Sequence, residues 1–172
     1  IRGDKASSDM CTSQALLAGM AAMYAVWHGP EGIARIAGKV ARLTAITAEG
    51  LRRLGYDLAN DAFFDTLTVR TPGRARRIAA KALEKRINLR VLDADTLGLS
   101  LDETTRRGEI EALWTCFDSA AGAALSVADL DAEAAEGEPE ALCRTTPYLT
   151  HPVFNRYRSE TEMMRYLRRL QE

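Results

Sequence analysis

The feature that most limits the fold is the apolar stretch ALLAGMAAMYAVW, from Ala15 to Trp27, which contains no charged residue. Ser7, Ser8 and Asp9 precede it, and residues of these types cap helices by accepting hydrogen bonds from free backbone N–H groups. We therefore predict a helix from about Met10 to Trp27. Because the stretch is apolar almost all round, we expect the helix to be buried on most of its faces. It is too short for a membrane span, which needs roughly 18 apolar residues.

The sequence His28-Gly29-Pro30 should end this helix, and Pro30 suits the first turn of another. Apolar residues then recur at helical spacing up to Gly55: Ile33, Ile36, Ala37, Val40, Leu43, Leu51 and Leu54. Two long helices separated by so short a break predict a bent rod or a tight corner.

Beyond Gly55 the hydrophobic period changes from about 3.6 to 2, as expected for a half-buried strand. The segment FFDTLTVR has this alternation, and Pro72-Gly73 then turns the chain into RARRIAAKALEKRI, an amphipathic helix. Its basic outer side could bind phosphate or nucleic acid, although we expect a solvated surface. Two short strands, Asn88–Leu92 and Leu97–Leu101, form a hairpin in the next segment.

Another amphipathic helix follows, with its apolar face formed by Ile110, Leu113, Trp114 and Phe117. The order of elements is therefore helix, helix, strand, helix, strand, strand, helix. It predicts an α+β fold, in which helices cover a small, mostly antiparallel sheet. We place this domain at residues 1–117.

The composition shifts between Asp118 and Cys143, where seven acidic residues and no basic one occur. We interpret residues 118–143 as a mobile acidic linker with one short helix at most. Residues 144–172 form a patterned C-terminal arm beyond it. There Ser159 and Glu162 have the spacing of a capping box.

Few residues of this chain could carry chemistry. The net charge is −1, which gives no general attraction to nucleic acid or anionic membrane, and only two histidines occur. The three cysteines match neither a disulfide framework nor a zinc site. There is no glycine-rich phosphate loop and no nucleophile elbow. Of the four lysines, Lys39, Lys81 and Lys85 lie on polar helix faces and Lys5 precedes the first helix, so we expect no catalytic, metal or Schiff-base residue here.

The segment DKASSDMCTSQALLAGMAAMYAVWHGPEGIARIA closely resembles part of the glycine cleavage system P-protein family. FFDTLTV, LGLSLDETT and LTHPVFNRYRSETEMMRYLRRL recur there in the same order. The resemblance places the chain at the end of the family's N-terminal half. That half is similar to a fold-type I pyridoxal-phosphate enzyme without its lysine, and this chain would contribute its small domain. The catalytic half, with the lysine of an HKTF motif, would follow in a fused polypeptide.

The resemblance implies glycine decarboxylation with pyridoxal phosphate as cofactor, followed by aminomethyl transfer to the lipoyl H-protein. Its implied partners are the catalytic half and the H-protein, with a homodimer when full-length. The chain itself would be structural. It also implies a cofactor-facing role for Ser7, Ser8 and Thr12, near the phosphate bound by the catalytic half. Asp9, which replaces the family's usual Asn, adds a negative charge and is better suited to capping. Capping of the apolar helix alone explains the serines equally well.

Two other interpretations stay open. The chain could be a non-enzymatic interaction module whose arginine-rich tail binds an acidic partner, or an independently acting enzyme, which the missing lysine disfavours. Its alanine and arginine usage indicates a bacterial cytoplasmic protein, although a mitochondrial matrix protein without its leader would look similar.

Overall fold

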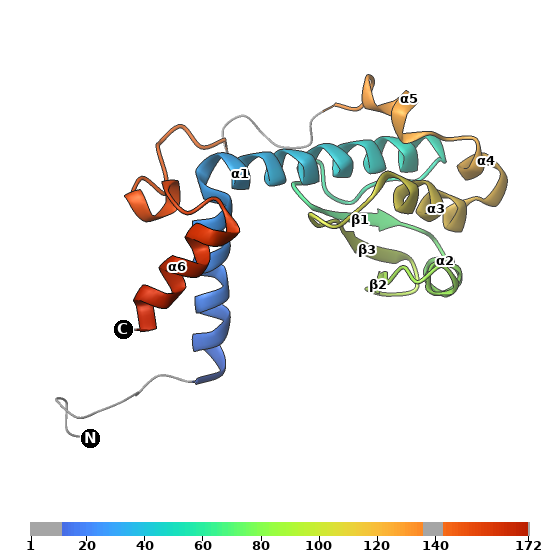
Figure 1. Ribbon diagram of the computed structural model, residues 1–172. Coiled ribbons are helices and arrows are strands. Elements are labelled where there is room, and N and C mark those ends of the chain that lie inside the picture. The colour runs from blue at the N-terminus through green and yellow to red at the C-terminus, as the bar shows by residue number, and fades with distance from the viewer. Residues whose placement is uncertain (1–11, 136–142, 172) are drawn as a thin grey trace. The chain divides into compact units, whose positions relative to one another are not determined.

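A computed structural model describes residues 12–135 and 143–171, apart from the side chains of residues 12 and 13 (Figure 1). The chain forms two compact units. One consists of residues 36–144, and the other joins residues 1–35 to residues 145–172. Among the helices of the described part, none combines the length and apolar character that crossing a bilayer requires.

The predicted break at His28-Gly29-Pro30 is confirmed inside helix α1, Thr12–Arg53. Gly29 has φ 60° and ψ −176°, which interrupts the helical backbone, and Pro30 follows it. A positive φ costs glycine nothing because it has no Cβ. The predicted end at Gly55 is also confirmed, since Gly55 lies just beyond α1 with φ 79°.

The sheet has three antiparallel strands in the order β1-β3-β2. They are β1, Thr66–Arg70; β2, Arg90–Val91; and β3, Thr96–Ser100. Leu67 pairs with Leu99 and Val69 with Leu97, and these four side chains are buried. The α+β prediction is therefore confirmed, although β2 is shorter than the predicted strand over residues 88–92.

Helices α2, Ala75–Glu84, and α3, Arg107–Phe117, complete the main core of this unit. Trp114 of α3 is fully buried, and its indole Nε1–H donates to the backbone carbonyl of Thr47 at 3.3 Å. A Cβ at Gly50 of α1 would overlap this indole. The close fit of α3 against the second part of α1 therefore depends on a glycine.

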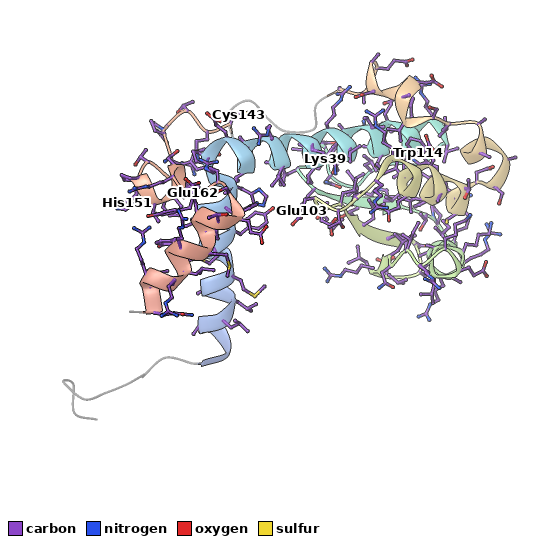
Figure 2. The ribbon with its side chains drawn as sticks, viewed as in Figure 1. Lys39, Glu103, Trp114, Cys143, His151 and Glu162 are labelled. Atoms are coloured by element: carbon purple, nitrogen blue, oxygen red, sulfur yellow. The ribbon has the colours of Figure 1, made fainter. Side chains whose placement is uncertain are left out.

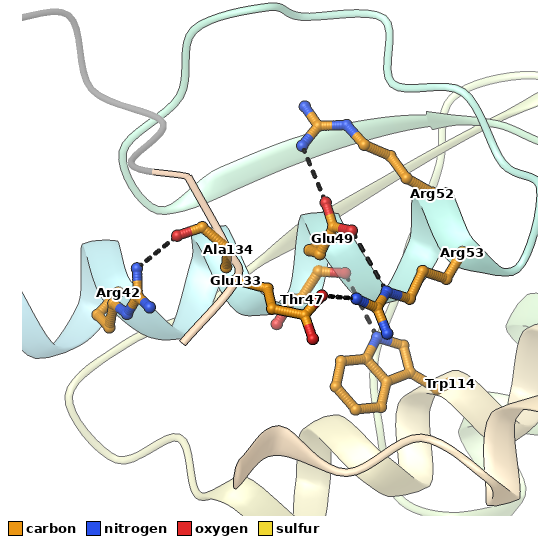
Figure 3. A network of polar contacts seen from close by, with 8 residues as sticks. All are labelled: Arg42, Thr47, Glu49, Arg52, Arg53, Trp114, Glu133 and Ala134. Atoms are coloured by element: carbon orange, nitrogen blue, oxygen red, sulfur yellow. Dashed lines mark hydrogen bonds and ion pairs between the residues drawn. The ribbon is translucent and has the colours of Figure 1, made fainter. Parts of the chain in front are cut away.

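The acidic segment is more ordered than the sequence predicted. Up to residue 135 it holds two short helices, α4 (Ser119–Ala123) and α5 (Val127–Asp131). Val127 and Leu130 are buried in the core. Asp131 pairs with Arg42 at 2.8 Å, and Glu133 pairs with Arg53; Figure 3 shows Arg42 and Arg53 reaching from α1 toward this segment. The remainder of the expected linker, residues 136–142, lies outside the described residues, and the predicted domain boundaries stay a prediction.

The C-terminal arm contains the short 3₁₀ helix η2, Pro152–Asn155, and helix α6, Glu160–Gln171. The rings of Tyr157 and Tyr166 stack with their centroids 4.4 Å apart. None of the α6 side chains is buried.

One expectation from the sequence is wrong for this chain. The first part of α1 was expected to be buried on most faces, but Leu16, Leu17 and Met20 are 69%, 65% and 59% exposed. An apolar helix is buried only where other residues pack against it, and its own composition does not show whether they do.

Candidate functional site

The three residues expected to face a cofactor are not placed by the structure. Ser7 and Ser8 lie outside the described residues, and Thr12 begins α1 but its side chain is not described. The described residues therefore test neither a capping nor a phosphate-facing role for this segment. Both roles stay predictions.

The described lysines do not form a Schiff-base site. The Lys39 ammonium group donates to the backbone carbonyl of Glu103 at 3.0 Å in an exposed position (Figure 2). Lys81 lies in α2 and Lys85 is its exposed C-cap residue. A lysine that forms a Schiff base needs a desolvated pocket or a neighbouring cation to lower its pKa. Residues 12–135 and 143–171 contain no lysine in such a pocket, so they do not fit a covalently held pyridoxal phosphate.

Asp102, in the segment LDETT, has a structural role. The Asp102 carboxylate accepts hydrogen bonds from the Thr104 hydroxyl at 2.7 Å and the Thr104 backbone N–H at 2.9 Å, and also from Thr105. These bonds, that of the Thr104 hydroxyl above all, lower the pKa of Asp102 below its usual range. The carboxylate is therefore ionised and a weak base, which leaves it poorly suited to accept a proton in catalysis. At the start of α3, the Glu109 carboxylate accepts from the backbone N–H of Arg106 at 2.7 Å.

Two cavities lie beside this turn. One, of about 270 Å³, lies over the apolar side chains of Leu99, Ile110 and Leu113 and opens near Asp102. The other, of about 260 Å³, has Lys39, Arg42, Arg106 and Arg107 around it. Asp131 pairs with Arg42 and lies 3.6 Å from Arg107, so part of that positive charge is neutralised. In the first cavity the hydroxyl groups of Thr104 and Thr105 donate to Asp102, but the lowered pKa of this carboxylate makes it a weak base. No His, Cys, Asp or Glu cluster in the described ranges could hold a metal ion.

Cys116 is equally unsuited to chemistry. It is buried, and this burial raises the pKa of its thiol above the usual range. Because the thiolate is the reactive form, the thiol is expected to be inert.

The C-terminal arm binds at the break in α1, which the sequence reasoning missed. Arg158 donates to the backbone carbonyl of His28 at 2.6 Å and to that of Phe154 at 2.8 Å. The hydroxyl of Tyr148 donates to the carbonyl of Pro30 at 2.5 Å. A Cβ at Gly29 would overlap the Arg158 guanidinium, so glycine is needed there for contact as well as for conformation. A helix break exposes backbone carbonyls that need donors, which is the signal that could have pointed to this contact.

The predicted capping box of the arm forms in part. The backbone N–H of Glu162 donates to the Ser159 hydroxyl at 3.3 Å, as expected. The Glu162 carboxylate accepts from that hydroxyl at 3.2 Å and from the backbone N–H of Arg158 at 3.4 Å, one residue earlier than a standard box.

Comparison with known proteins agrees with the motifs. Residues 1–117 match the family model described as glycine cleavage system P-protein. Over all 172 residues the chain is 52% identical to "Glycine dehydrogenase (decarboxylating)" of Nitrobacter hamburgensis. It is 54% identical over 170 residues to the protein of that name from Bradyrhizobium sp., and 52% identical over 178 aligned positions to that from Paraburkholderia xenovorans. The chain spans only 17–18% of the length of these relatives. On this evidence, the chain belongs to the glycine cleavage system P-protein family.

Proposed function

We propose that this chain is a structural and interface segment of a glycine-decarboxylating enzyme, and that it is inactive by itself. The observation that carries the proposal is about 50% identity, along the whole chain, to proteins named glycine dehydrogenase (decarboxylating). The full-length protein would be an oxidoreductase of the glycine cleavage system. It would remove carbon dioxide from glycine and pass the remaining aminomethyl group to the lipoyl arm of the H-protein.

The cofactor of the full-length protein would be pyridoxal phosphate. When bound, it supplies an electron sink for the electron pair left on the glycine α-carbon as carbon dioxide departs. The lysine that holds it would lie in the catalytic half, beyond these 172 residues. In support, the ammonium group of Lys39 is engaged by a backbone carbonyl rather than buried in a pocket.

The role of this chain would be to support the catalytic half. The unit of residues 36–144 has a continuous core, and such a core can hold a neighbouring surface in place. Ser7, Ser8 and Thr12 would face the cofactor phosphate, because the N–H groups and dipole of a helix N-terminus favour anions. We further propose a homodimer and a bacterial cytoplasmic location, the latter from the alanine and arginine usage noted above.

The test is glycine decarboxylation by the full-length protein supplied with pyridoxal phosphate and lipoylated H-protein. Release of labelled carbon dioxide from carboxyl-labelled glycine, and little from labelled alanine or serine, is the expected result. No release above a control without the P-protein would contradict the proposal.

The runner-up function, an interaction module for an acidic partner, has one specific observation in its favour. Arg156, Arg165, Arg168 and Arg169 surround an open groove on the C-terminal arm, with Glu162 as its acidic member. Arg169 also donates to the hydroxyl of Tyr157. Tight binding of an acidic protein by the full-length polypeptide, without any decarboxylation, would favour this alternative.

A further inference from the structure

We propose that the first part of α1, residues 14–27 apart from the buried Val26, is a docking surface for the rest of its own polypeptide, outside these 172 residues. The inference rests on the proposed function in one respect, which is that the occupant belongs to a full-length P-protein.

The docking surface has two distinct sides. At 3.6 residues per turn, its large side chains fall within about one third of the helix circumference. This bulky face consists of Leu16, Leu17, Met20, Met23, Tyr24 and Trp27. All of them except Met23 are among the exposed large hydrophobic side chains of the chain. The opposite side carries mainly alanine and Gly19. Soluble proteins rarely leave a contiguous apolar patch of this kind uncovered.

The second part of the same helix provides a comparison within the molecule. There Val40, Leu43, Ile46 and Leu51 are buried in the core of residues 36–144. Its other side carries charges, for example Arg52, whose side chain is 45% exposed. A helix that packs on one side only is amphipathic in this way. The first part has no charged residues that would form a solvent-exposed side, so its composition fits a helix that is packed on several sides.

Gly19 gives a second, independent indication. Glycine inside a helix is less favourable than alanine, so it needs a reason. Among the described residues, nothing lies within 4 Å of a Cβ placed at Gly19. The same holds for Gly38, but Gly38 lies one turn from Arg35 and Arg42, as on a solvated side. The residues one turn from Gly19 are all apolar: Ala15, Leu16, Ala22 and Met23. Close approach of another backbone, from a segment outside the chain, would supply a reason for Gly19.

The polypeptide needed to cover the surface is available. The relatives matched along the whole chain are more than five times as long as it, because it spans 17–18% of them. A surface covered within one polypeptide stays covered at any protein concentration, since the local concentration of a tethered partner is fixed by the chain. A second copy or a separate protein is released once the protein is diluted below the dissociation constant of the complex.

The experiment follows oxidation of the native Met20 side chain by peroxide in the full-length protein, with peptide mass spectrometry as readout. The variant Arg77→Met supplies a reference, because Arg77 lies exposed on α2 and its replacement adds an accessible thioether to the same molecule. Oxidation of Met20 should be at least about tenfold slower than in urea-denatured protein and slower than at the reference position. Both results should persist when the protein is diluted to a concentration at which gel filtration shows it to be a monomer.

Three outcomes would overturn the proposal. Oxidation of Met20 as fast as the reference would show that the surface is free. Protection lost on dilution would identify a second copy as the occupant, and protection only after adding H-protein would identify that partner. Decarboxylation is assayed on the same preparation. If Met20 is protected in a protein that does not decarboxylate glycine, the result supports the docking surface and refutes the proposed function.

A second pair of variants tests the close approach at Gly19. Gly19→Leu should lower the melting temperature of the full-length protein by several degrees and accelerate oxidation of Met20. Gly38→Leu is the matched control, because Gly38 is also a helical glycine of α1 with nothing within 4 Å of an added Cβ. Equal effects of the two substitutions would contradict a buried surface at Gly19.

Discussion

Replacing Gly50 by alanine tests the packing of the core most sharply, because a general rule and this structure predict opposite signs. Alanine stabilises a helix interior by about 1 kcal/mol relative to glycine. At Gly50, however, the new methyl group would overlap the indole of Trp114. Trp114 is fully buried and hydrogen-bonded to the Thr47 carbonyl, so it has little room to move.

The expected magnitude follows from three terms. Overpacking of a filled core costs about 1–3 kcal/mol, and weakening the indole hydrogen bond costs about 1 kcal/mol more. After the helix propensity of alanine is subtracted, Gly50→Ala should destabilise the chain by about 1–3 kcal/mol. Gly38→Ala, in the same helix but with open space around it, should stabilise it by up to about 1 kcal/mol.

The assay is urea denaturation of the 172-residue chain, followed by far-ultraviolet circular dichroism. The two variants should move the midpoint in opposite directions. If Gly50→Ala were as stable as Gly38→Ala, Trp114 could not pack against α1 as described.

Three further predictions concern the helix start, the arm and the Asp102 turn. In the full-length enzyme, the double variant Ser7→Ala and Ser8→Ala should retain pyridoxal phosphate less well, and this loss should exceed any loss of thermal stability. If the variant keeps its cofactor affinity and its melting temperature falls by only about a degree or two, the serines only cap the helix. Arg158→Ala should speed amide hydrogen exchange in α6 by up to about tenfold, because it removes hydrogen bonds worth about 1 kcal/mol at the α1 break. The control is Arg165→Ala, which replaces an exposed arginine of α6. Equal exchange rates in the two variants would refute the contact. Because folding lowers the pKa of Asp102, its stabilising effect should be complete above its ordinary pKa of 3.8 and should disappear as the pH falls through its folded value. The stability difference between wild type and Asp102→Asn should therefore shrink in acid. A stability difference that does not depend on pH would contradict this prediction.

Local patterns predicted the elements whose stability is local. The His28-Gly29-Pro30 break, the alternation in β1 and the spacing of Ser159 and Glu162 each depend on residues a few positions apart, and each is present in the structure. The order of these elements was enough to predict an α+β fold.

Features that depend on distant residues were not predicted. Helices α4 and α5 have five residues each, too few to be stable alone. Packing supports both of them, since Gly122 of α4 lies close against the backbone of Trp114, and Val127 and Leu130 of α5 enter the core. The binding of Arg158 at His28 joins residues 130 positions apart, which no local pattern records. The exposure of Leu16 and Met20 could not be predicted either, because the surface that we propose to cover them lies outside the chain.

The central proposal is that this chain is a non-catalytic segment of a pyridoxal-phosphate enzyme. Borohydride reduction of the full-length protein loaded with cofactor fixes the cofactor to the lysine that holds it, and peptide mass spectrometry then locates that lysine. We predict a single cofactor-bearing peptide from outside residues 1–172. A cofactor fixed to Lys5, Lys39, Lys81 or Lys85, or to no lysine at all, would contradict the account.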